Sequence, residues 1–191
     1  MKHSSFTALY DANVLYPAPL RDLLMNLALT GVYRARWLAR IHDEWKRNLL
    51  INRPDLDRTQ LDRTSGLMDE AVPDALVSDY EPLMGGLDLP DEDDRHVLAA
   101  AIKCNASVIV TFNLKDFPDT ALGSFDIEAL HPDDFIADLR DLDKAAVLEA
   151  AQRQRQSLKN PALSVQAYLD KLLQQKLPES VKLLSEFRFL L

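Results

Sequence analysis

The chain has 191 residues, of which 47% are hydrophobic and 27% are charged, and this is the composition of an ordinary globular protein that can bury a core. No apolar run reaches the roughly 18 residues of a membrane span, and the first residues make a poor signal peptide, so we expect a cytoplasmic protein with no membrane association. The single cysteine, Cys104, excludes an internal disulfide and a cysteine-rich zinc site. A formal net charge of −8 argues against nucleic-acid binding through bulk electrostatics alone.

The charge is unevenly distributed along the chain. Residues 31–53 contain six basic and two acidic side chains, whereas residues 69–94 contain ten acidic side chains and no lysine or arginine. A basic strip beside an acidic segment differs in its binding properties from a uniformly acidic surface.

The amino-terminal part of the sequence predicts one strand followed by helices. Residues 6–10 are rich in strand formers and end at Asp11, so they are expected to form the first strand. Apolar residues at helical spacing then predict helices over 19–31, 34–50, 55–71 and, less regularly, 74–84. Trp37 and Trp45 lie at helical spacing with core residues in the second of these helices, and we expect them to pack in the core.

The central part alternates helices with strands. Residues 91–104 predict a helix whose cap and first turn are acidic, and residues 107–112 form a continuous β-branched run, as in a parallel strand covered on both faces. Residues 125–130 predict another strand and residues 131–139 another helix. This alternation predicts an α/β fold in which a parallel sheet is flanked by helices.

The pattern changes near residue 142, after which only helices are predicted, over 144–158, 164–176 and 178–191. We therefore divide the chain into an α/β domain, residues 1–141, and an all-helical C-terminal extension, residues 142–191. The amphipathic helices of this extension are expected to pack on the core, to form a homodimer or to bind a partner.

Acidic residues occur at positions that a parallel sheet brings to one edge. Asp11 follows the first strand, and Asp116, with Asn113 three residues before it, follows the strand at 107–112. Ligands of open parallel sheets bind beyond the carboxyl ends of the strands. Glu44 and Asp94, on predicted helices, are candidates to complete the group. Converging carboxylates repel one another unless they share a cation, and oxygen ligands favour Mg²⁺ or Mn²⁺.

Four segments carry a resemblance to a known family: YDANVLYP, HDEWKRNL, DEDDRHVLAAAI and VIVTFNLKDFP. In this order they resemble the motifs of PIN-domain nucleases, and in particular the bacterial branch that includes VapC-type toxins of toxin–antitoxin modules. The resemblance covers roughly residues 5–137. It implies a PIN-like three-layer fold and hydrolysis of RNA with a divalent metal held by three or four acids.

Matched residue by residue, Asp11, Glu44 and Asp94 correspond to the acidic triad of that family. Many members have an aspartate where this chain has Asn113, so either Asp116 fills the fourth position or Asn113 holds a metal-bound water. The resemblance thus implies catalytic roles for Asp11, Glu44, Asp94 and Asp116, metal ligation by the same four and Asn113, and supporting roles for Asn13 and Thr111.

The implied function is a metal-dependent endoribonuclease, the toxin of a type II toxin–antitoxin module, with an RNA substrate and an antitoxin protein as partners. Residues of the basic strip and its surroundings are expected to contact the RNA backbone, namely Arg40, Lys46, Arg47 and Arg95. Two alternatives stay open: a phosphate-receiving signalling domain, and a catalytically inactive PIN-fold binding module that the Asn113 departure supports.

Some residues near these motifs have simpler interpretations. Asp91, Glu92 and Asp93 are expected to act as helix caps or solvated charges, because aspartate is a preferred N-cap and negative charge stabilises a helix start. His42 and His96 are interpreted as histidines at the edge of the core, which are commoner than histidines that contact a substrate.

Overall fold

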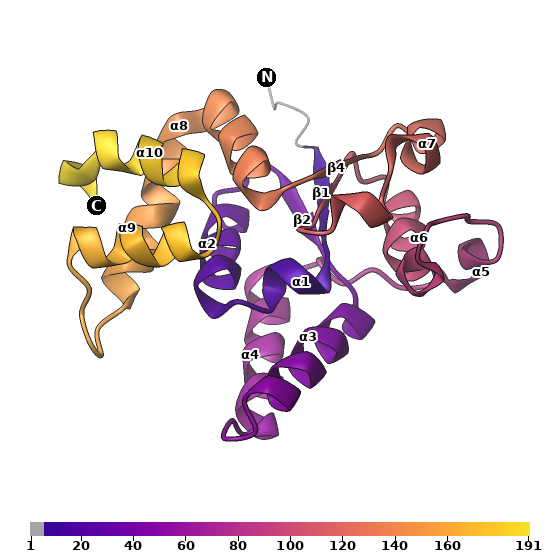
Figure 1. The fold of residues 1–191 in the computed structure, drawn as a ribbon, viewed down its shortest axis with the longest axis horizontal. Coiled ribbons are helices and arrows are strands. Elements are labelled where there is room, and N and C mark those ends of the chain that lie inside the picture. The colour runs from indigo at the N-terminus through magenta and orange to yellow at the C-terminus, as the bar shows by residue number, and fades with distance from the viewer. Residues whose placement is uncertain (1–5) are drawn as a thin grey trace. The chain divides into compact units, whose positions relative to one another are not determined.

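The structure is a computed structural model that describes residues 6–191 (Figure 1). The chain forms two compact units. The first contains the residues up to Tyr16 together with 33–131, and the second contains 17–32 together with 132–191. Within the described part of the chain, no helix has both the length and the apolar character needed to cross a bilayer.

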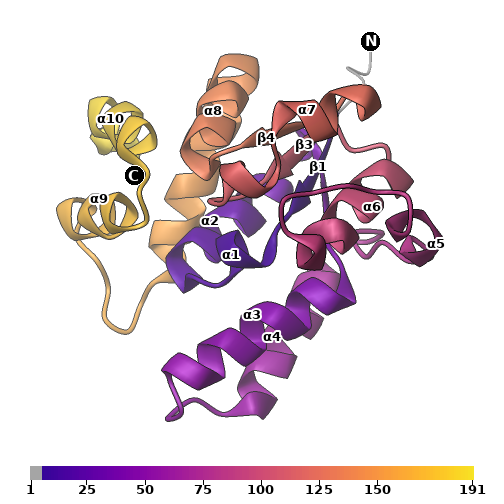
Figure 2. The same ribbon diagram turned by 45° about the vertical axis from the view of Figure 1, so that its right-hand side comes forward.

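The first unit is built on a parallel sheet with the strand order β2-β1-β3-β4. Figure 2 shows β1, β3 and β4 side by side. Every residue of β1 and β3 is buried, as expected of strands whose residues are apolar on both faces. The parallel α/β prediction is confirmed, with strands at Thr7–Tyr10 (β1), Arg34–Arg36 (β2), Val108–Val110 (β3) and Glu128–Leu130 (β4).

The predicted helix over 34–50 is wrong at its start, where the chain forms strand β2. Ala35 is buried between the exposed Arg34 and the half-buried Arg36, and the Arg34 amide donates to the Phe6 carbonyl at 2.9 Å. Pairing with β1 therefore overrides the helical preference of this segment, because the strand contacts are made with residues distant in sequence. The predicted helix over 74–84 is likewise reduced to four residues at its end.

Helices flank this sheet within the first unit. Helix α6 packs against β1 and β3, and α3 packs against α1 and α4. In Figure 2 the pair α3 and α4 extends away from the sheet. The bounds of these helices are Ala12–Leu15 (α1), Ala39–Asn52 (α3), Arg58–Ala71 (α4), Glu81–Met84 (α5), Arg95–Lys103 (α6) and Asp119–Leu122 (α7).

A partly buried hydrogen-bonded group joins α3 to α4. Asp69 accepts from the Trp37 indole at 2.7 Å and lies 3.0 Å from Nε2 of His42. The indole of Trp45 donates to Nδ1 of His42 at 3.0 Å, so the proton of the neutral ring lies on Nε2 and points to Asp69. Burial lowers the pKa of His42, despite the opposing effect of Asp69. His42 is therefore a packing residue, and Trp37 and Trp45 are fully buried, as predicted.

The second unit is helical, and all the named strands of the described chain lie in the first unit. Helix α8 packs against α2 and α10, and α9 packs against α10 (Figure 1). Helix α8 joins two predicted helices across a kink at Asp143, which has non-helical backbone angles. The helices of this unit are Ala18–Ala28 (α2), Pro132–Ser157 (α8), Val165–Gln174 (α9) and Pro178–Glu186 (α10).

Asp133 on α8 caps the first turn of α10. Its side chain is 4% exposed, and its two carboxylate oxygens accept from the backbone amides of Glu179 at 2.8 Å and Ser180 at 2.9 Å. The Ser180 hydroxyl also donates to Asp133 at 2.6 Å. The first amides of a helix have no partner inside the helix, so a buried carboxylate here stabilises both the helix and its docking.

We predict that Asp133→Ala lowers the free energy of unfolding of the second unit by about 2 kcal/mol or more, because charged hydrogen bonds to buried amides are lost. Urea unfolding followed by circular dichroism measures this change. The neighbouring exposed Asp134→Ala is the control and should change the free energy by at most about 0.5 kcal/mol. Equal unfolding midpoints for the two variants would contradict the stabilising role of the cap.

Candidate active site

Asp11 is held at the carboxyl end of β1 by hydrogen bonds from three directions. The Ala12 amide donates to Oδ1 at 2.6 Å, and the Thr111 hydroxyl and the Asn13 amide both donate to Oδ2 at 2.7 Å. Burial raises the pKa of Asp11, whereas the bonds from Thr111 and Ala12 oppose this shift. A carboxylate that is 6% exposed thus keeps a fixed orientation through contacts with the adjacent strand end.

Asn13 ties the loop after β3 to Asp11. Its carbonyl oxygen accepts from the Phe112 amide at 3.1 Å, and its side-chain amide also donates to Thr111 at 2.9 Å. The Thr111 hydroxyl in turn accepts from the backbone of Asn113 at 3.0 Å. The side chains of Asn13 and Thr111 therefore position both Asp11 and the segment that leads to Asp116.

Three carboxylates form a compact cluster beside this network. Asp91, Asp94 and Asp116 each place an oxygen within 4.8 Å of the others. Burial, together with the neighbouring carboxylates of Asp11 and Asp91, raises the pKa of Asp94 to about 6. This mutual repulsion and the all-oxygen donor set fit a hard divalent cation such as Mg²⁺ or Mn²⁺.

Asp91 is the member of this cluster interpreted from the sequence as a helix cap or a solvated charge. Its carboxylate does cap the turn, because it accepts from the Asp93 amide at 2.9 Å, but it also faces Asp94. Residues three apart lie on one side of a 3₁₀ turn, and this spacing is the signal that could have identified Asp91.

Asn113 and Asp116, the two candidates for the fourth acidic position, are hydrogen-bonded to each other. The Asn113 side-chain amide donates to Oδ2 of Asp116, and Asp116 rather than Asn113 belongs to the carboxylate cluster. Asn113 itself lines the adjoining cavity. An amide at this position can therefore orient the acid that supplies the negative charge.

Glu44 and His96 form a second pair of contacting polar side chains. Nε2 of His96 lies 3.3 Å from the Glu44 carboxylate, and Nδ1 lies 2.7 Å from the Asp93 carbonyl. Both ring nitrogens thus face oxygen atoms of the adjoining residues. Burial by itself raises the pKa of Glu44, but hydrogen bonds from His96 and Arg40 outweigh it and lower the pKa. His96, interpreted from the sequence as a core-edge residue, therefore contacts a candidate site residue.

Most of these side chains line one cavity of about 510 Å³, but Asp91 and Asp116 are not part of its wall. Asp11, Glu44 and Asp94 reach it from the end of β1, from α3 and from the turn before α6. Its wall also contains polar side chains that are not carboxylates, which are Asn13, Tyr16, Arg47, Asn48, Asn52, His96 and Asn113. Residues distant in sequence thus form one acidic depression with a polar margin.

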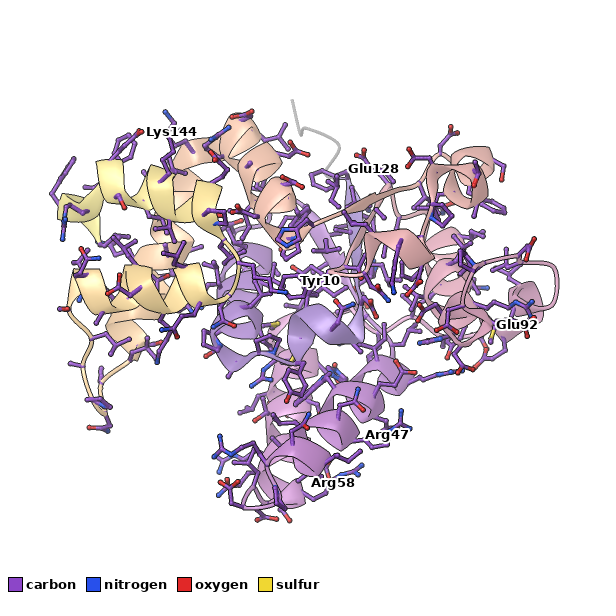
Figure 3. The ribbon with its side chains drawn as sticks, viewed as in Figure 1. Tyr10, Arg47, Arg58, Glu92, Glu128 and Lys144 are labelled. Atoms are coloured by element: carbon purple, nitrogen blue, oxygen red, sulfur yellow. The ribbon has the colours of Figure 1, made fainter. Side chains whose placement is uncertain are left out.

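Arg47 and Arg40, both on α3, differ in their contacts. Arg47 is exposed on α3 (Figure 3) and lines the cavity. The Arg40 guanidinium forms an ion pair with Glu44 at 2.9 Å and reaches the Asp93 carbonyl at 3.4 Å. Arg47 is therefore available to a ligand, whereas Arg40 neutralises an acid of the site.

Lys46 and Arg95 do not line the cavity. Lys46 is 7% exposed, and its ammonium donates to Asp62 at 2.7 Å and to Ser65 at 3.3 Å, so it joins α3 to α4. Arg95 forms an ion pair with Glu92 at 3.0 Å. Of the four basic residues predicted to contact RNA, the structure brings Arg47 to the cavity wall.

Comparison with known proteins identifies the family. The family model described as "PIN domain" matches residues 7–115, which is more than half of the chain. The chain belongs to the PIN domain family. A second model, described as "VapC50 C-terminal domain", matches residues 132–186. The predicted resemblance to VapC-type PIN domains is confirmed, and it replaces the alternative of a phosphate-receiving signalling domain.

A curated relative supports the same assignment. This PIN-domain chain is 46% identical over 82 residues to the Mycobacterium tuberculosis protein named "Putative ribonuclease VapC50". The match covers 43% of this chain and 48% of that protein, so the chain spans about half the length of the relative. No solved structure matched the chain.

We predict that Asp94→Asn stabilises the metal-free PIN domain at pH 7. The raised pKa means that ionisation of Asp94 costs more in the folded state than in the unfolded state. Asp94 therefore reduces stability progressively as pH rises from about 4 to about 6, and the full reduction persists above that range. Thermal unfolding in EDTA at pH 7 and pH 4.5 should show the larger gain at pH 7.

The control for this experiment is Glu70→Gln, which removes an exposed acid of α4 outside the cavity. Added Mn²⁺ should reverse the order, raising the melting temperature of the wild type more than that of Asp94→Asn. Identical melting temperatures at pH 7 in EDTA would show that neither burial nor the neighbouring carboxylates disfavour the ionised form of Asp94.

Proposed function

We propose that this PIN domain is a metal-dependent endoribonuclease that hydrolyses RNA phosphodiester bonds with Mg²⁺ or Mn²⁺. The observation that carries the proposal is the convergence of Asp11, Glu44 and Asp94 on one cavity beside a cluster of carboxylates. Membership of the PIN domain family and the name of the mycobacterial relative support it.

The donor set suits a divalent cation held by Asp91, Asp94 and Asp116, with Asp11 as a further ligand. A carboxylate offers about four lone-pair directions, and the three hydrogen bonds to Asp11 leave one of these free. Burial and the neighbouring carboxylates both raise the pKa of Asp94, and a bound cation would offset both effects. When bound, the cation supplies Lewis-acid polarisation of a phosphate and lowers the pKa of a coordinated water.

The remaining residues orient other groups of the site, or hold or accept a proton. Glu44 is ionised because its pKa is lowered, and its carboxylate can orient a water or accept a proton from it. His96 holds a proton at Nε2 next to Glu44 and is fixed through Nδ1 by the Asp93 carbonyl. Asn13 and Thr111 keep Asp11 directed at the cavity, and Arg47 provides a cation for a phosphate oxygen.

We also propose that this chain is the toxin of a type II toxin–antitoxin module and that an antitoxin protein inhibits it. The match of residues 132–186 to the "VapC50 C-terminal domain" model supports this reading, because it extends the likeness to VapC-type proteins beyond the nuclease unit. We further propose that residues 142–191 serve as the partner-binding or packing extension.

The test is cleavage of single-stranded RNA by the purified chain with Mn²⁺, with and without chelator. We predict that Asp11→Asn lowers the cleavage rate by about 100-fold or more, because it removes charge at the cavity while preserving side-chain size. Glu70→Gln is the control and should cleave at the wild-type rate. If Mn²⁺ binds, as measured by calorimetry, and RNA nevertheless stays intact, the chain is a catalytically inactive PIN-fold binding module and the nuclease proposal is wrong.

A further inference from the structure

Three residues of α3, each four positions after the last, lie along one line of the helix, and all three are part of the cavity wall. These are Glu44, Asn48 and Asn52. Residues four apart lie on the same face of an α-helix, and with a rise of 1.5 Å per residue the line from Glu44 to Asn52 is about 12 Å long. One end of the line is therefore at the acids, and the other is at the end of the helix.

The far part of this line is polar but carries no acid. The Asn48 side-chain amide has no hydrogen-bond partner among the residues that the structure describes. The Asn52 side-chain nitrogen donates to the Tyr16 hydroxyl and to the Asn48 carbonyl, each at 3.1 Å, so its oxygen is left as an acceptor. Arg47 adds a positive charge on the same wall, and within the described chain no carboxylate lies at ion-pair distance from it.

These groups match the exposed parts of a single-stranded nucleotide. Asparagine can pair with adenine through its amide donor and its carbonyl acceptor together. Single-stranded RNA presents such base edges and stacks its bases on aromatic rings. Tyr16 supplies a ring at the cavity wall, and Arg47 can contact a phosphate. Asparagine is also a weak helix former, so helix stability alone does not favour it at two successive turns.

We propose that the line Glu44–Asn48–Asn52 is the path of the RNA strand and that Asn48 and Asn52 read the bases next to the scissile phosphate. This inference rests on the proposed nuclease function and adds sequence preference to it. Asn48 has both donor and acceptor free and favours adenine. Asn52 has only its acceptor free and favours a base with an exocyclic amino group, which adenine, cytosine and guanine have, over uracil, which has none.

The experiment uses the full chain with Mn²⁺ and a pool of single-stranded RNAs of randomised sequence, with the product ends sequenced. Wild-type cleavage should enrich adenine and deplete uracil beside the cut. Asn48→Ala and Asn52→Ala should each reduce kcat/KM about tenfold for the enriched sequences and leave the others nearly unchanged. Asn48→Asp, which keeps only acceptors, should shift the enrichment from adenine toward cytosine. Gln60→Ala, an exposed amide on α4 outside the cavity, is the matched control.

Binding of short labelled RNAs, measured by fluorescence anisotropy with Ca²⁺ in place of Mn²⁺, separates this inference from the proposed function. The two alanine variants should bind an adenine-containing RNA about tenfold more weakly and bind an oligouridine like the wild type. If the wild type cleaves RNA but the two alanine variants give the same product ends and RNA affinities as the wild type, the base-reading role is wrong and the nuclease function is supported. If the wild type binds RNA with this preference but cleaves none, the proposed nuclease function is wrong and the base-reading role of Asn48 and Asn52 is supported.

Discussion

The hydrogen bond from Thr111 to Asp11, 2.7 Å long, is the contact on which the site depends. It joins residues a hundred positions apart, and it forms because β1 and β3 are adjacent parallel strands that end at the same edge. Asn13 connects the same two residues a second time, because its side-chain amide donates to both Asp11 and Thr111. A buried carboxylate is costly without such partners, so the strand pairing and the site chemistry stabilise each other.

The carboxylates of the site differ in the charged groups that surround them. Glu44 is balanced by His96 and Arg40, and its pKa is lowered. Asp94, in contrast, faces other carboxylates, and its pKa is raised. Negative charge without a cationic hydrogen-bond partner thus lies at Asp11 and in the carboxylate cluster, and the geometry of the cluster suits a divalent cation. A polyanionic substrate would be repelled from this cavity without such an ion.

The basic residues of α3 show how one helix serves structure and site together. Lys46 points into the contact with α4 and is buried there, whereas Arg40 neutralises Glu44 and Arg47 faces the cavity. Position on the helix circumference, rather than charge, decides these roles. The same rule places Glu44, Asn48 and Asn52 on a single wall, which explains how a nearly neutral surface adjoins the acids.

The sequence by itself determined the α/β class, the buried strands over 6–10 and 107–112, and the candidate acids, because apolar runs and motif order are local features. Only the tertiary structure decided that residues 34–36 form a strand, that Asp91 joins Asp94 and Asp116, and that His96 contacts Glu44. It also assigned 17–32 to the same unit as the carboxyl-terminal helices. Each of these depends on contacts between distant segments, and local propensity carries no information about such partners.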